Sequence, residues 1–273
     1  MMNMTFTEFV TLPGFRLEYA ALLLAKDVAY PNMDIEVYIQ RLDEISAVVA
    51  GRVHPRDEPL DIIKRLNQYL FEEQGYQGNR ENYYDPRNSF LNDVITRHTG
   101  IPITLSVLYI TLARRLGVPL FGVGLPGHFV TGYQVANCQV YLDPFHEGLI
   151  LSDEECLHIA AHYLSSGAGL PRHLLAPVSN QDILWRMLTN LRQIYIAQVD
   201  STRLLRVLCL QSALRPDDVE LRRDIGALSV QQENWGQAVR TLRTYFYQRP
   251  QAEDIDNVRA LLDQALTHLS RLN

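Results

Sequence analysis

The first third of the chain carries apolar residues at intervals of three and four, which is the spacing of one helix face. Three segments show this pattern: residues 15–29, 33–51 and 59–75. Gly51 and Gly75 end the second and third segments in the manner of helix C-caps. The pattern predicts three amphipathic helices, followed over residues 76–89 by a structured loop rich in Gly, Asn and Pro.

The hydrophobic pattern changes after residue 100. From Ile103 to Leu112 nearly every position is apolar or small, which predicts a helix over 102–116 that is buried on most sides. Pro102 suits its first turn, because the first amide of a helix needs no acceptor. Three short apolar runs then predict strands, at residues 119–125, 128–135 and 139–145. We expect them to form a small antiparallel meander with helices on one face.

From about residue 180 the helical pattern returns and repeats. Three pairs of similar residues are each 34 positions apart, which is the period of tetratricopeptide helix-turn-helix units. The pairs are Asp200 and Asn234, Leu205 and Val239, and Pro216 and Pro250. An unrelated helical bundle is the alternative, since the tetratricopeptide consensus is only partly filled. The sequence thus divides into a core with N-terminal helices, residues 1–175, and tetratricopeptide-like helical repeats, residues 176–273.

Composition and charge narrow the class of protein. A net charge of −6 argues against nucleic acid as a partner, because phosphate binding depends on clustered Lys and Arg. No window of about 18 uncharged apolar residues predicts a membrane span, and the N-terminus has no basic segment typical of a secretory signal. Three widely spaced cysteines form neither a metal pair nor a disulfide framework, which favours the reducing cytoplasm.

Candidate chemistry lies on the predicted strands. His128 begins the run "HFVTGYQV", and Asp143 lies near the end of "QVYLDPF". A histidine and an aspartate on neighbouring strands can orient one another beside a nucleophile. The plainer interpretation is a hydrogen bond that ties two strands together.

The block "YYDPRNSFLNDVITRHTGIPITLSVLYITLARRLGVPLFGVGLPGHF", followed by "YLDPF", resembles the SirB family, which joins a transglutaminase-like core to C-terminal tetratricopeptide repeats. The resemblance implies an α+β fold: a helical N-terminal part, a papain- and transglutaminase-like core with a small antiparallel sheet, and an all-α C-terminal segment. In the wider group, a cysteine at a helix N-terminus is the nucleophile, a histidine takes its proton and an aspartate orients the imidazole. The resemblance assigns the last two roles to His128 and Asp143.

The resemblance places the nucleophile at the start of the 102–116 helix, where the aligned position is Pro102. Proline offers no acid group and no side-chain nucleophile. Thr104 and Ser106 are hydroxyl candidates in the same helix, although buried hydroxyls bonded to helix carbonyls are the plainer interpretation. The histidine and the aspartate are therefore expected to be present without a thiol.

Other polar residues are weaker candidates. Asp85, Arg87 and Asn88 could line the same cleft or simply build a turn. In the repeats, four arginines could bind carboxylates or form a solvated face: Arg222, Arg223, Arg240 and Arg243. His158 and His162 have the i, i+4 spacing of zinc ligands but lack a third ligand, so we expect a surface face, no metal and no cofactor.

These inferences favour a non-catalytic transglutaminase-like protein that acts as a protein- or peptide-binding, regulatory module through its core cleft and repeats. The alternative is a cysteine-independent hydrolase or acyltransferase that uses Thr104 or Ser106 with His128 and Asp143. The sequence does not indicate the partner or the oligomeric state.

Overall fold

The computed structural model describes residues 4–135, 138–164 and 170–272. The chain divides into two compact units. The core unit comprises residues 14–26 and 30–187, and the repeat unit comprises residues 1–13, 27–29 and 188–273. The boundary predicted after residue 175 stays a prediction. Within the described residues, no helix is long and apolar enough to cross a membrane.

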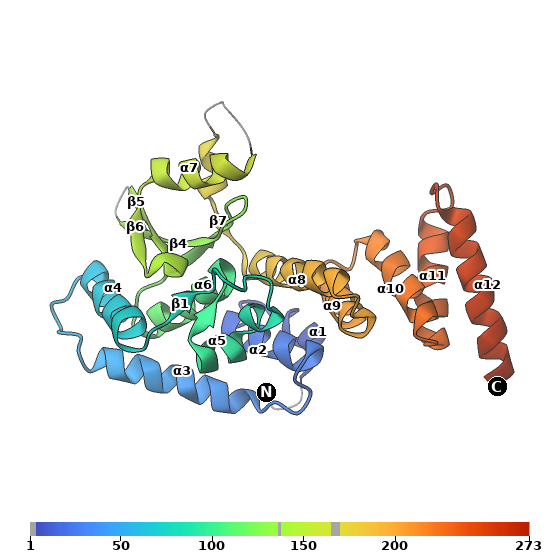
Figure 1. The fold of residues 1–273 in the computed structure, drawn as a ribbon, viewed down its shortest axis with the longest axis horizontal. Helices are drawn as coiled ribbons and strands as arrows, with labels where there is room; N and C mark the ends of the chain where they lie inside the picture. The colour runs from blue at the N-terminus through green and yellow to red at the C-terminus, as the bar shows by residue number, and fades with distance from the viewer. Residues whose placement is uncertain (1–3, 136–137, 165–169, 273) are drawn as a thin grey trace. The chain divides into compact units, whose positions relative to one another are not determined.

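The predicted amphipathic helices of the core unit are confirmed (Figure 1). They are α2 (Leu17–Val28), α3 (Ile35–Ala50) and α4 (Pro59–Asn67), the last continued by a π-helical stretch, Gln68–Glu73. The Asp34 side chain caps the start of α3 by accepting the amide of Glu36. Gly75 has a left-handed backbone with φ of 68°, so it ends the third helical segment where the sequence predicts.

The buried helix is α6 (Pro102–Arg115), and α5 (Leu91–Arg97) precedes it. Pro102 occupies the first turn of α6, as expected. All twelve residues from Pro102 to Ala113 are buried, so the nearly continuous apolar pattern is explained by a helix that is covered on every side.

The sheet has five antiparallel strands in the order β6-β5-β4-β3-β7. These strands are β3 (Phe121–Val123), β4 (Val130–Val135), β5 (Cys138–Asp143), β6 (Leu149–Leu151) and β7 (Pro177–Val178). The predicted three-strand meander is β3-β4-β5, and pairing of Thr131 with Leu142 sets the register of β4 against β5. The two outer strands extend it beyond the prediction.

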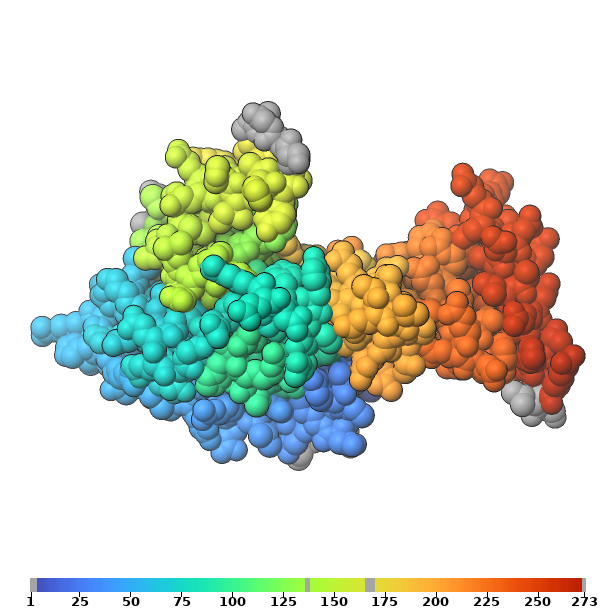
Figure 2. Space-filling model, in the orientation of Figure 1, coloured from blue at the N-terminus to red at the C-terminus, as the bar shows by residue number. Residues whose placement is uncertain are grey.

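Helices cover both faces of the sheet, so the expectation of helices on one face is wrong (Figure 1). Tyr141 and Leu151 pack with Cys156 of α7 (Asp153–Leu164) on one face. Thr131 and Leu142 alternate to the other face, which α6 covers, and both are fully buried. In the space-filling view, the sheet and α7 form a continuous mass above the helices α4 to α6 (Figure 2).

The loop predicted over residues 76–89 contains short regular elements. Its strand β1 (Gln77–Gly78) pairs in parallel with β2 (Thr99–Gly100), and Pro86–Ser89 forms a turn of 3₁₀ helix. The structured loop predicted there therefore also contains regular structure, which the sequence does not indicate because a two-residue strand is too short to produce a hydrophobic pattern.

The repeat unit contains a short N-terminal helix and the C-terminal helical series. These helices are α1 (Phe6–Phe9), α8 (Asn180–Ala197), α9 (Ser201–Leu214), α10 (Val219–Gln231), α11 (Trp235–Gln248) and α12 (Ile255–Leu272), with the first residues of α8 belonging to the core unit.

The backbone of the repeat unit repeats with the same period as the sequence. Asp200 and Asn234, which are aligned in the sequence, are both N-caps, of α9 and α11 respectively. The residues before them, Val199 and Glu233, both have left-handed backbones, with φ of 56° and 58°. Such conformations are uncommon outside glycine, so their recurrence at one period marks equivalent turns and supports tetratricopeptide units over an unrelated bundle.

Candidate functional site

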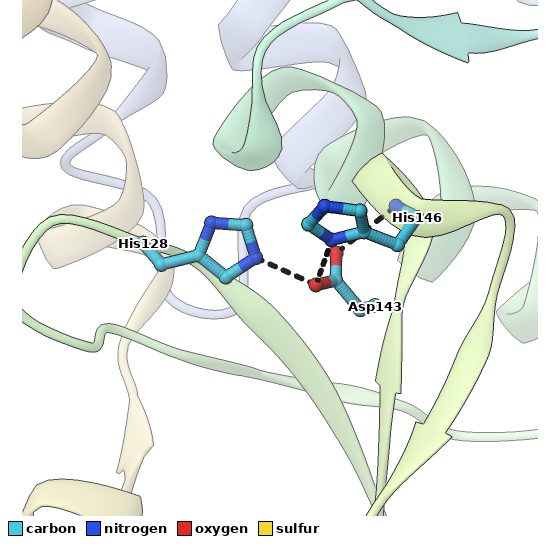
Figure 3. Close-up of side chains that lie close together, drawn as sticks. All are labelled: His128, Asp143 and His146. Carbon is cyan, nitrogen blue, oxygen red and sulfur yellow. Dashed lines mark hydrogen bonds and ion pairs between the residues drawn. The ribbon is translucent and has the colours of Figure 1, made fainter. Parts of the chain in front are cut away.

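Three side chains of the core unit converge where strand β4 begins and strand β5 ends (Figure 3). His128 lies just before β4, at the end of a turn in which its amide donates to the carbonyl of Leu125. Asp143 is the last residue of β5, and His146 ends the turn of 3₁₀ helix, Pro144–His146, that follows it. The antiparallel pairing of β4 and β5 brings the start of one strand beside the end of the other.

Asp143 is the centre of this cluster. Its Oδ2 lies 2.7 Å from Nε2 of His128 and 2.7 Å from Nδ1 of His146. Its Oδ1 accepts the amides of Phe145 and His146, at 3.0 and 3.3 Å, and so caps the 3₁₀ turn. An ionised carboxylate only accepts hydrogen bonds, so each imidazole donates an N–H to the same oxygen.

The surroundings of Asp143 keep it ionised. Burial alone would raise the pKa of this carboxyl group, since its side chain is only 1% exposed. The hydrogen bond and charge of His128, followed by those of His146, outweigh burial and lower the pKa below its usual value. His128 is also buried, whereas the side chain of His146 is 41% exposed.

Arg186 in α8 holds the turn that carries His128. Its Nη2 donates to the carbonyls of Leu125 and His128, at 2.7 and 2.8 Å, and its guanidinium lies over the ring of Phe129. Burial lowers the pKa of Arg186, and the two carbonyls are its described acceptors. This arginine therefore orients the backbone on both sides of the turn.

The start of α6 offers no thiol. Pro102 is buried in its first turn, and the Thr104 hydroxyl donates to the carbonyl of Asn88 at 2.6 Å. The Ser106 hydroxyl is buried and has no hydrogen-bond partner among the described residues. Neither hydroxyl is among the described hydrogen-bond partners of His128, and the back-bond to a helix carbonyl expected for both is formed by neither.

The three cysteines are free and lie elsewhere. Cys156 is fully buried beneath the sheet, and burial, assisted by the charge of Asp143, raises the pKa of its thiol to about 12. Burial also raises the pKa of Cys209, which accepts a hydrogen bond from Gln237. Raised thiol pKa values make both groups poor nucleophiles at neutral pH. Cys138 is exposed at the start of β5.

Comparison with known proteins places this chain in a family. The sequence model of the transglutaminase-like superfamily matches residues 36–189, which is more than half of the chain. The chain belongs to the transglutaminase-like superfamily. A tetratricopeptide repeat model matches residues 191–263. Together these matches confirm the predicted fold class, a transglutaminase-like α+β core followed by a helical repeat segment.

Relatives of this transglutaminase-like chain include proteins named UPF0162. The one from Xylella fastidiosa (strain Temecula1) is 36% identical over 264 residues, covering 95% of this chain and 92% of the relative. That of Vibrio cholerae is 29% identical over 228 residues, covering 83% and 82%. F-box only protein 21 of Mus musculus is 34% identical over 171 residues, which are 59% of this chain and 26% of that protein. No solved structure matches the chain.

The loop candidates Asp85, Arg87 and Asn88 are not among the residues that line an open cleft in the transglutaminase-like core. The cleft has a volume of about 770 Å³ and is lined by Gln77, Gly78, Asn79, Arg80, Glu81, Arg97, Thr99, Phe145, His146 and Glu147. Asn88 is buried and accepts a hydrogen bond from Asn79 in the cleft wall. Asp85 caps the 3₁₀ turn and pairs with Arg87 at 2.7 Å, so both side chains are engaged in the turn itself.

The four arginine candidates of the repeat unit differ in their surroundings. Arg223 pairs with Asp224 and Asp254, at 2.9 and 3.0 Å, and Arg222 donates to the carbonyl of Pro216. Arg240 and Arg243 are exposed on α11. The latter two are therefore the more accessible candidates for a carboxylate partner.

Sequence reasoning missed His146 and Arg186. The "DPFH" motif places His146 three residues after Asp143, but only a 3₁₀ turn capped by Asp143 brings both to one point. Arg186 lies on a helix with an amphipathic pattern, and nothing in its neighbourhood indicates that it bonds to a loop some 60 residues earlier.

Proposed function

We propose that this chain is a non-catalytic transglutaminase-like protein whose core and repeats bind a protein or peptide partner. The observation that carries the proposal is Pro102, which occupies the first turn of α6, the position that the resemblance aligns with the cysteine of the wider group. An imidazole held by a carboxylate activates nothing unless a nucleophile faces it.

The state of the other nucleophilic groups supports the same proposal. Thr104 donates its proton to a backbone carbonyl, and the pKa of Cys156 is raised to about 12. The alternative, a hydroxyl-dependent hydrolase, needs Thr104 or Ser106 to leave a fully buried position before it can attack a substrate.

The binding role is supported by the architecture of the chain and of its relatives. Tetratricopeptide units are stacked helix pairs that present extended binding surfaces. The related segment of mouse F-box only protein 21 is 26% of that protein, which supports a module that functions within different proteins. The motifs around His128 favour the SirB family in particular, and the free cysteines favour the cytoplasm.

Labelling with reactive electrophiles tests the non-catalytic assignment. The intact chain and a His128→Ala variant are incubated with fluorophosphonate, β-lactone and vinyl sulfone probes, and adducts are located by mass spectrometry. We expect no adduct that depends on His128; exposed Cys138 serves as the internal control for labelling that does not. A His128-dependent adduct on Thr104, Ser106 or a cysteine overturns the proposal and supports the enzyme.

Peptide binding tests the partner role. Fluorescent acidic peptides are titrated against the chain and an Arg240→Gln, Arg243→Gln double variant. Loss of two carboxylate contacts is expected to weaken binding by roughly tenfold or more. Arg259→Gln is the matched control, because Arg259 is also an exposed arginine of the repeat unit but lies near Asp256. No saturable binding, or an equal loss in the control, contradicts this role.

A further inference from the structure

We propose that His128, Asp143 and His146 form a binding site for a divalent transition metal ion of the Zn²⁺ class. This site goes beyond the partner-binding function. The three potential ligand atoms all lie within 4.8 Å of one another, so they are grouped closely enough for one ion to be bound among them after a small adjustment.

The ligand set indicates the class of metal. Two imidazole nitrogens and one carboxylate oxygen form a 2-His-1-carboxylate set, which suits zinc, iron, cobalt and nickel. Mg²⁺ and Ca²⁺ prefer oxygen ligands throughout and are therefore poor occupants.

The distances require little rearrangement. Metal–ligand bonds of about 2.0–2.2 Å place neighbouring ligand atoms roughly 3.0–3.5 Å apart. Oδ2 of Asp143 is 2.7 Å from a nitrogen of each histidine, so each gap has to widen by less than about 1 Å to admit an ion. His146 can supply this movement, because its side chain is partly exposed and ends a short turn.

The hydrogen bonds show what an ion would replace. Two N–H groups point at one carboxylate oxygen, so two protons occupy the place that a divalent cation fills in a metal site. An imidazole that binds the ion through this nitrogen carries its remaining proton on the other ring nitrogen.

The groups that would orient two of the ligands are already in place. Oδ1 of Asp143 is held by two backbone amides, which direct Oδ2 at the histidines. Arg186 fixes the turn of His128 through two carbonyls. The open cleft reaches His146, which provides a route for the ion and room for a fourth ligand such as water.

Metal titration of the full chain tests the site. Zn²⁺ is titrated calorimetrically, and Co²⁺ is followed by its visible absorption, with Mg²⁺ as the negative arm. We expect one Zn²⁺ per chain and a Co²⁺ spectrum with nitrogen ligands. His146→Gln should weaken binding by at least roughly 10–100-fold, which is the loss caused by removing a group that only orients a ligand, since it removes a ligand itself.

The matched control is the double variant His158→Gln, His162→Gln. These histidines are exposed on α7 at the i, i+4 spacing and belong to no described group of three ligands. Binding should be unchanged in this control, whereas His128→Gln should reduce it as His146→Gln does. The proposal is overturned by the absence of saturable Zn²⁺ binding, by full binding in His146→Gln, or by loss confined to the His158 and His162 control.

Discussion

The hydroxyl groups of Thr104 and Ser106 lie on the same buried helix but differ in their hydrogen bonding. The Thr104 hydroxyl donates to the Asn88 carbonyl, whose other backbone contact is a long 3.4 Å bond from Ile101. The Ser106 hydroxyl is equally buried and has no partner among the described residues. Of the two hydroxyls, only that of Thr104 satisfies a buried backbone carbonyl.

This difference predicts opposite mutational effects. Thr104→Val leaves a buried carbonyl poorly satisfied and should lower the free energy of unfolding by about 1–3 kcal/mol. Ser106→Ala removes an unsatisfied polar group and should be close to neutral or slightly stabilising. Urea denaturation measures both, and an equal destabilisation by the two variants would contradict this account.

At the scale of elements, the N-caps of α9 and α11 occupy equivalent positions in the repeat but form hydrogen bonds of different length. Asp200 accepts the amide of Arg203 at 2.9 Å, and its charge lies at a helix N-terminus. Asn234 accepts the amide of Gln237 at 3.4 Å and carries no charge. The same position in two repeats thus stabilises its helix to different extents.

We expect Asp200→Ala to destabilise α9 by about 1–2 kcal/mol and Asn234→Ala to destabilise α11 by about 0.5–1 kcal/mol. Hydrogen exchange of the amides in each helix measures the two effects separately. A larger loss of protection in the asparagine variant would show that the cap geometry does not set helix stability here.

The elements that the sequence predicts are those with long, regular patterns. Pro102 and the apolar run after it predict α6, and Gly75 predicts where its helical segment ends. Strand β6 escapes prediction because it has three residues, of which Leu149 and Ile150 are exposed. For the site, His128 and Asp143 follow from motif and strand position, whereas His146 depends on a turn that only the folded backbone defines.

At the scale of the whole molecule, buried carboxylates make stability depend on pH. Glu18 is 1% exposed and receives ion pairs from Arg16, Arg114 and Arg115. Burial opposes ionisation, but the three arginines and a backbone amide together lower the pKa of Glu18 below its usual value. The unfolded chain therefore binds this proton first as the pH falls, so the contribution of Glu18 is present above the ordinary pKa of 4.5 and is lost as the pH drops through the folded value.

Glu18→Gln should accordingly lower the free energy of unfolding at pH 7 by on the order of 3 kcal/mol, because it leaves arginines unpaired around a buried side chain. The difference from the unmodified chain should shrink toward pH 3, as measured by urea denaturation across the pH range. Glu44→Gln is the control, since Glu44 forms an exposed pair with Arg41 and should change stability by less than about 1 kcal/mol. A constant difference at every pH would rule out ionisation as the cause.

The contacts of Asp143 with the 3₁₀ turn, His128 and His146 have a practical consequence for genetic experiments. Asp143 is the last residue of β5, and its carboxylate caps the following 3₁₀ turn and accepts hydrogen bonds from two histidines. Any replacement of Asp143 therefore affects both the local fold and the candidate site. A null phenotype from that codon would therefore be uninformative about mechanism. Substitution of His146, whose ring is partly exposed to solvent, is expected to affect function with less effect on folding.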